Sequence, residues 1–109
     1  MMRGSTLAVV AAALSVASAH ALAQEFNVTI RNNAFVPQEI RVPAGKRASI
    51  YVGNEDASAE EFESPALKVE KVIPGKSKGL VRVGPLAPGR YEFFGDFHPD
   101  TAKGVVIAE

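Results

Sequence analysis

The amino-acid sequence predicts an all-β protein, a single antiparallel Greek-key β-sandwich of about seven to eight strands. Three observations predict this fold. Apolar and polar residues alternate with period two in several short segments, turn-forming Pro and Gly recur between these segments, and one turn carries a tyrosine corner motif. Short strands at this turn frequency are typical of a sandwich rather than of a helical or mixed α/β domain.

The alternation identifies the strands in chain order. Phe26, Val28 and Ile30 point one way with polar residues between them, and residues 48–52 repeat the pattern. The sequence predicts further strands at 39–42, 67–72, 79–83, 90–94 and 104–108. Residues 55–65 are acidic and contain Ala and Ser, and two interpretations stay open for them: a loop or a short helical turn.

Turns separate these segments. Pro and Gly occur together at residues 43–45, 74–75, 84–85 and 88–89, where Pro presets a turn and Gly supplies unusual backbone angles. The segment Leu86-Ala87-Pro88-Gly89-Arg90-Tyr91 has the form of a tyrosine corner, in which the Tyr hydroxyl bonds to backbone a few residues upstream. This element supports the fold and says little about function.

The first residues have the pattern of a secretory signal peptide. Arg3 gives a positive start, residues 7–16 are apolar and alanine-rich, and Ala21-Leu22-Ala23 is a small-residue cleavage site. We therefore expect residues 1–23 to be cleaved, residues 24–109 to form one domain, and the protein to be periplasmic. A single membrane anchor is the alternative, but polar residues interrupt the apolar run before the ~20 residues that a span needs.

Length and composition limit the function classes. Subtracting 23 from 109 residues leaves 86, which is room for one small core, and the formal net charge of the whole chain is zero. This balance predicts no nucleic-acid partner. The chain has no Cys, so disulfides cannot stabilise it, and no Ser–His motif predicts a hydrolase. At most we expect an accessory oxidation of ferrous iron rather than an enzyme proper.

His98 is the first candidate metal ligand. It is the only His after residue 23, and it lies in a loop between the aromatic segment Tyr91-Glu92-Phe93-Phe94 and the apolar segment Gly104-Val105-Val106. An imidazole presented by a short, rigid loop is suited to hold a metal. The alternative is an ordinary surface histidine in an acidic turn.

Carboxylates form the second candidate group. Glu60, Glu61 and Glu63 lie close together in the sequence, and if this stretch is extended Phe62 points inward while Glu61 and Glu63 share the outer side. Asp96 belongs to the His98 loop. Imidazole with several carboxylates suits Fe, Mn, Zn or Cu(II). The alternative is a solvated acidic loop.

The whole segment from Phe26 to Ile107 resembles the cupredoxin-like family. The resemblance places Gly95 where blue-copper sandwiches have a cysteine ligand, Thr101 where methionine is expected, and Glu60 at the position of the first ligand histidine. Type 1 blue copper is therefore excluded, because its site needs the cysteine thiolate.

Two segments, Glu60-Glu61-Phe62-Glu63 and Gly95-Asp96-Phe97-His98-Pro99-Asp100, are similar to the periplasmic cupredoxin-like components of bacterial iron uptake systems, of the EfeO and FtrABCD types. The resemblance implies a protein that binds iron and/or copper and assists oxidation of ferrous iron or its delivery. Its implied partner is an iron permease or another periplasmic iron-binding protein, with no membrane span after signal cleavage. Two alternatives stay open: a copper-handling protein, and a metal-free sandwich whose acidic loop docks a partner.

Overall fold

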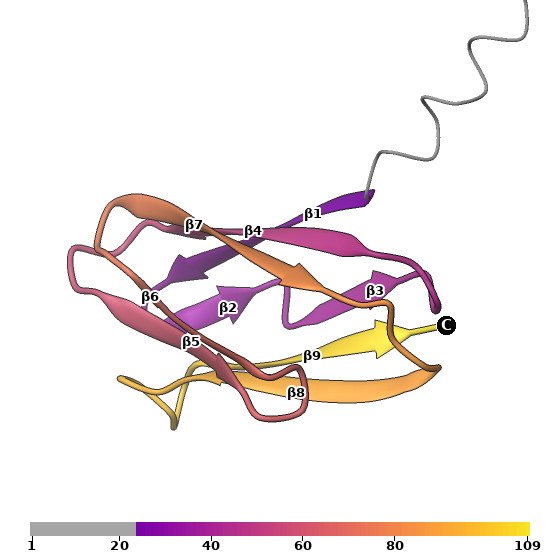
Figure 1. Cartoon of the computed structure of the whole chain (residues 1–109). Helices are drawn as coiled ribbons and strands as arrows, with labels where there is room; N and C mark the ends of the chain where they lie inside the picture. The colour runs from indigo at the N-terminus through magenta and orange to yellow at the C-terminus, as the bar shows by residue number, and fades with distance from the viewer. Residues whose placement is uncertain (1–23) are drawn as a thin grey trace, which may run out of the picture.

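The computed structural model describes residues 24–109, which form a two-layered β-sandwich without helices (Figure 1). The predicted signal peptide, residues 1–23, lies outside the described residues. The nine strands, in chain order, are β1 (Gln24–Arg31), β2 (Ala34–Val36), β3 (Glu39–Val42), β4 (Ala48–Asn54), β5 (Glu60–Ser64), β6 (Val69–Ile73), β7 (Ser77–Val83), β8 (Gly89–Gly95) and β9 (Lys103–Ala108).

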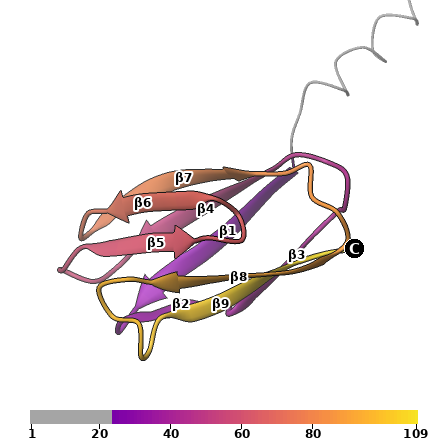
Figure 2. The same cartoon turned by 60° about the horizontal axis from the view of Figure 1, so that its bottom comes forward.

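The strands form a four-stranded sheet in the order β2-β1-β4-β7 and a five-stranded sheet in the order β3-β9-β8-β5-β6. Two neighbouring pairs, β1 with β4 and β3 with β9, are parallel, and the others are antiparallel. The predicted β-sandwich is confirmed, but it is not antiparallel throughout. Parallel neighbours require crossover connections, and here the crossovers pass between the two sheets. Figure 2 shows β6 beside β7, where the chain passes from one sheet to the other.

Alternating inward side chains of both sheets form the core. Every second residue of β4 is buried, and the same period of two appears in β1, β5 and β8. At the centre the rings of Phe62 and Phe93 stack with centroids 4.6 Å apart, and Phe35 meets Phe93 edge to face at 5.0 Å. Offset and edge-to-face pairs of this kind contribute about 0.5–1.5 kcal/mol each beyond the area they bury.

Most predicted strands are confirmed within one or two residues, and the tyrosine corner is confirmed as well. The Tyr91 hydroxyl donates to the backbone oxygen of Ala87 at 2.7 Å. Two strands were not predicted as such. β2 has only three residues, and β5 lies in the segment for which a loop or a helical turn was expected.

Strand β5 follows the extended alternative that the sequence allowed. Glu60, Phe62 and Ser64 are buried, whereas Glu61 and Glu63 face outward. Phe62 pairs with Gly95 of β8, so β5 brings the acidic segment next to the end of the aromatic strand. Within residues 24–109, no helix is long and apolar enough to span a membrane.

Candidate functional site

The β4–β5 loop and the β8–β9 loop lie at the same end of the sandwich, on the left in Figure 1. The β4–β5 loop, residues 55–59, is anchored by Asn54, which is buried at the end of β4. Its side-chain amide donates to the backbone oxygens of Ser58 (2.9 Å) and Ile73 (3.1 Å), and its side-chain oxygen accepts from the backbone N–H of Asp56 (3.0 Å). With all its donors and acceptors used locally, Asn54 fixes how β5 starts.

The β8–β9 loop, residues 96–102, is closed by its own backbone. The N–H of Gly95 donates to the oxygen of Ala102 (2.9 Å), the N–H of Ala102 donates to the oxygen of His98 (2.9 Å), and the N–H of His98 donates to the oxygen of Gly95 (3.1 Å). This tight closure holds the His98 ring over the end of β5, where Glu60 begins the strand.

Glu60 and His98 form an inner pair. The Nδ1 atom of His98 lies 2.7 Å from Oε2 of Glu60, whose side chain is 1% exposed, whereas the His98 side chain is 30% exposed. Oε1 of Glu60 accepts two backbone N–H donors at 2.9 Å, from Glu61 and from Phe97. A buried carboxylate is costly unless hydrogen-bonding partners surround it, and two backbone N–H groups and the Nδ1 atom of His98 do so here.

Gly95 leaves the space that the Glu60 carboxylate occupies. A Cβ atom built at Gly95 would lie 2.5 Å from Cδ and 2.7 Å from Oε2 of Glu60, and 2.7 Å from Cβ of Ala102. Carbon atoms in contact normally lie about 3.5–4.0 Å apart. No side chain at position 95 is therefore compatible with Glu60 in its present place.

The remaining predicted ligands form a second group on the outer face of the same sheet. Glu61, Glu63 and Asp96 each offer one carboxylate oxygen, and these three atoms lie within 4.8 Å of one another. Strand period places Glu61 and Glu63 side by side, and the backbone N–H of Asp96 donates to the oxygen of Glu61 at 2.9 Å. The turn after β8 thus delivers Asp96 to the pair on β5.

The pKa of Glu61 is raised above its ordinary value of 4.5. Partial burial is the largest cause, followed by the charge of Glu70 on β6, a hydrogen bond with Glu63 and the charges of Glu63 and Asp96. The charges that raise this pKa belong to neighbouring carboxylates, which disfavour the ionised form of Glu61 by repulsion. A cation bound between them would relieve this repulsion.

The structure thus divides the five predicted ligands into two groups on opposite faces of one sheet, with Glu60 and His98 inside and Glu61, Glu63 and Asp96 outside. Sequence reasoning missed Glu70, which adjoins the outer group through the pairing of β6 with β5. It also missed the pairing of Glu60 with His98. The signal for this pair in the sequence was Glu60, a charged residue at a strand position whose side chain points inward.

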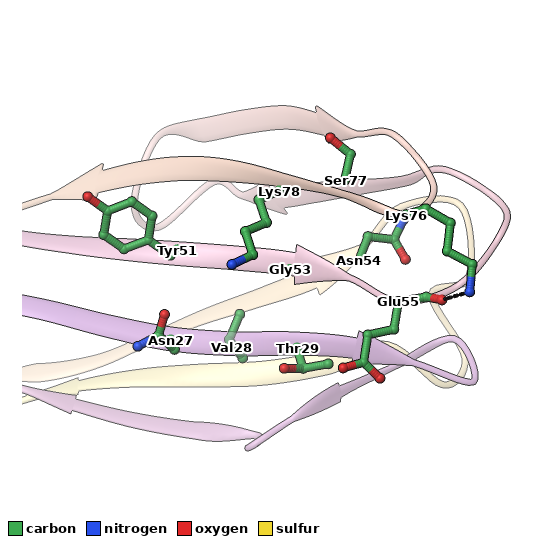
Figure 3. Close-up of a pocket in the computed structure, with 10 residues that line it drawn as sticks. All are labelled: Asn27, Val28, Thr29, Tyr51, Gly53, Asn54, Glu55, Lys76, Ser77 and Lys78. Atoms are coloured by element: carbon green, nitrogen blue, oxygen red, sulfur yellow. Dashed lines mark hydrogen bonds between the residues drawn. The ribbon is translucent and has the colours of Figure 1, made fainter.

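A hollow of about 600 Å³ lies on the other sheet, over β1, β4 and β7 (Figure 3). Gly53 provides its floor, and Thr29, Tyr51 and Lys78 stand around it, while Lys76 donates through Nζ to the backbone oxygen of Glu55 at 2.6 Å. None of the five predicted ligands lines this hollow.

Fold and loop geometry define the class of protein: a mixed β-sandwich that brings a His-bearing loop and an acidic strand together at one end. A family model described as a cupredoxin-like domain matches residues 4–108, and the chain belongs to this family. An uncharacterized protein of Rickettsia prowazekii (strain Madrid E) is 43% identical over 84 residues, which are 76% of this chain and 66% of that protein. The chain thus spans slightly less than two thirds of this relative's length.

Solved structures share the fold at low identity. Auracyanin A, a blue copper protein of Chloroflexus aurantiacus, is 16% identical with a TM-score of 0.67, covering 78% of this chain and 98% of that one. The metal-binding domain of the Cu(I)-exporting ATPase CopA of Streptococcus pneumoniae D39 is 17% identical with a TM-score of 0.66 (78% and 84%). Amicyanin from Paracoccus versutus is 18% identical with a TM-score of 0.63 (84% and 88%).

The family implies copper, but the residues of this chain do not fit a blue-copper site. Such a site uses two imidazoles and a thiolate in a trigonal arrangement. Here position 95 is Gly, its side-chain space is filled by Glu60, and Nδ1 of His98 is bound to that same carboxylate. Of the five predicted ligands, Glu61, Glu63 and Asp96 take no part in this inner pair.

Proposed function

We propose that this protein is an exported, periplasmic metal-binding component of an iron uptake system, with its cation site at Glu61, Glu63 and Asp96. The observation that supports this most directly is the outer cluster, in which three carboxylate oxygens lie within 4.8 Å of one another and neighbouring carboxylates raise the pKa of Glu61. Carboxylates in such proximity repel one another unless a cation or a proton lies between them.

Iron is the proposed cation because of the ligand type. Carboxylate oxygens suit hard cations, whereas thiolate and thioether ligands select copper, and the chain has no Cys. Three negative charges also stabilise a trivalent ion more than a divalent one. Ferrous iron bound here would therefore give up an electron to dioxygen more readily than in buffer, which supports a role in oxidising iron or delivering it to a permease.

Anaerobic titration of the purified protein with ferrous iron, manganese and cupric copper tests this proposal. The double variant Glu61→Ala/Glu63→Ala is expected to lose at least ~100-fold in iron affinity, since loss of mere outer-shell partners already costs 10–100-fold. The matched control is Glu25→Ala/Glu92→Ala, which removes two exposed strand carboxylates outside the cluster and is expected to bind iron as the wild type does. Equal affinity of the two double variants would refute the site.

Copper handling is the second candidate, supported by the copper proteins among the structural relatives and by the preference of nitrogen and oxygen sites for Cu(II) over other divalent ions. His98→Ala separates the two candidates. Copper bound through the imidazole would be lost in this variant, whereas iron at the outer carboxylates would remain. If no ion binds the wild type, the acidic face is a docking surface for a protein partner instead.

A further inference from the structure

The inner group of Glu60, Gly95 and His98 takes no part in the proposed cation site, yet it lies at the ligand positions of the fold. We propose that the Glu60 carboxylate occupies the space that a metal ion and a thiolate at position 95 would fill in a blue-copper site. It thereby keeps copper out of this space and holds the β8–β9 loop in place without a metal. The inference stands whether or not the outer carboxylates bind a cation.

Space is the first argument. The Glu60 carboxylate lies where the side chain of residue 95 would begin, with Cδ 2.5 Å from the Cβ position. A thiolate at position 95 and the carboxylate of Glu60 therefore exclude each other. Gly95 is the partner that the buried glutamate requires, and restoring the cysteine alone would not rebuild a copper site.

Hydrogen bonding is the second argument. The carboxylate accepts from the backbone N–H groups of Glu61 and Phe97 and contacts Nδ1 of His98, all between 2.7 and 2.9 Å. A metal that used Nδ1 would have to displace a carboxylate that is 1% exposed and would leave it without its imidazole partner. The imidazole nitrogen that faces inward is thus already bound within the protein.

Loop order is the third argument. A metal in this position would tie His98 to β5, and the Glu60 carboxylate provides this tie directly, while its bond from Phe97 fixes the residue before the histidine. Copper, which outcompetes other divalent ions at nitrogen and oxygen sites, is thereby kept from the position of the fold best suited to it. Glu60 is on this account the residue that excludes copper from this position.

Copper absorption and EPR spectra of designed variants of the purified protein test the inference. Glu60→His/Gly95→Cys, with His98 retained, supplies two imidazoles and a thiolate and is expected to gain the intense thiolate-to-copper band of such sites. Gly95→Cys alone is expected to show no such band and to melt at least ~8 °C below the wild type because of overpacking. A strong band in Gly95→Cys at wild-type stability would overturn the inference, as would its absence from a double variant with a native circular dichroism spectrum.

Hydrogen exchange in metal-free protein gives an independent test that needs no folded cysteine variant. In Glu60→Ala the Phe97 amide is expected to exchange at least ~10-fold faster relative to the amides of β9, which report global unfolding, because it loses a charged acceptor. The matched control Glu92→Ala removes an exposed carboxylate of β8 outside both groups and should leave this ratio unchanged. Equal ratios in wild type and Glu60→Ala would show that Glu60 does not hold the loop.

Discussion

Replacing Gly95 by alanine is expected to destabilise the sandwich by about 2–4 kcal/mol, although it adds a single methyl group. The added Cβ would lie 2.5 Å from Cδ of Glu60 and 2.7 Å from Cβ of Ala102. Contacts between carbon atoms need about 3.5–4.0 Å, so both contacts are about 1 Å too short. Ala102 is fully buried and belongs to the closed β8–β9 loop, so the carboxylate is the group that gives way.

The magnitude follows from two costs. Overpacking a core position costs about 1–3 kcal/mol. Displacing the Glu60 carboxylate also weakens its bonds to Phe97, Glu61 and His98, and hydrogen bonds to charged groups contribute about 1.5–3 kcal/mol each when lost completely. For a domain of this size each kcal/mol lowers Tm by about 4–8 °C, so a decrease of about 8–30 °C is expected.

Thermal and urea denaturation of Gly95→Ala against Gly53→Ala measures this effect. Gly53 is also a strand glycine, but a Cβ there would meet only Cγ of Lys78 at 3.9 Å. Its replacement is expected to be neutral or to stabilise by about 0.5–1 kcal/mol, as alanine does relative to glycine within a strand. If both variants melted within about 3 °C of the wild type, the close contact between Gly95 and Glu60 would be refuted.

Three further predictions concern single groups. Ser64→Ala should cost about 1–3 kcal/mol in urea denaturation, because the buried hydroxyl donates to the backbone oxygen of Glu92 at 2.6 Å and accepts from the N–H of Leu67 at 3.0 Å, and a methyl group can do neither; a cost below about 0.5 kcal/mol would contradict this role. Tyr91→Phe should cost about 0.5–1.5 kcal/mol through the lost bond to Ala87, and an unchanged midpoint would argue that the corner contributes nothing. Burial and neighbouring carboxylates raise the pKa of Glu61 in the folded protein above its ordinary value of 4.5, so ionisation of Glu61 disfavours the folded state as pH rises from the ordinary pKa through the raised one. Metal-free Glu61→Gln should therefore be more stable than the wild type above this pH range but not below it. A difference in stability that does not depend on pH would contradict the raised pKa.

The sequence predicted a strand correctly where the burial of its side chains follows the local alternation of apolar and polar residues. β3 was predicted with its observed bounds, and β1 and β4 followed from alternating apolar residues. β5 was harder, because two of its three inward residues, Glu60 and Ser64, are polar. Their partners are the β8–β9 loop and the backbone of Glu92, which are far away in the sequence, so a local pattern cannot show why these residues are buried.

The same difference between local pattern and long-range contact separates the outer group of the candidate site from the inner group. Period two in an extended segment was enough to place Glu61 and Glu63 together, and Asp96 joined them because β8 pairs with β5. The bond between Glu60 and His98 required the register of those two strands and the shape of the loop. Neither the register nor the shape of a turn can be read from the residue types alone.

The positions of the first and last strands constrain how this chain can fold. β1 lies between β2 and β4, and β9 lies between β3 and β8, so both ends of the described chain occupy interior positions in their sheets. Neither sheet is complete until segments far apart in the sequence have met, and topologies dominated by such non-local pairing fold in about milliseconds to seconds rather than microseconds. A chain that ended before Lys103 would leave β3 without the strand it pairs with and would expose the edge of β8, so removal of these last few residues would favour aggregation over a trimmed but native sandwich.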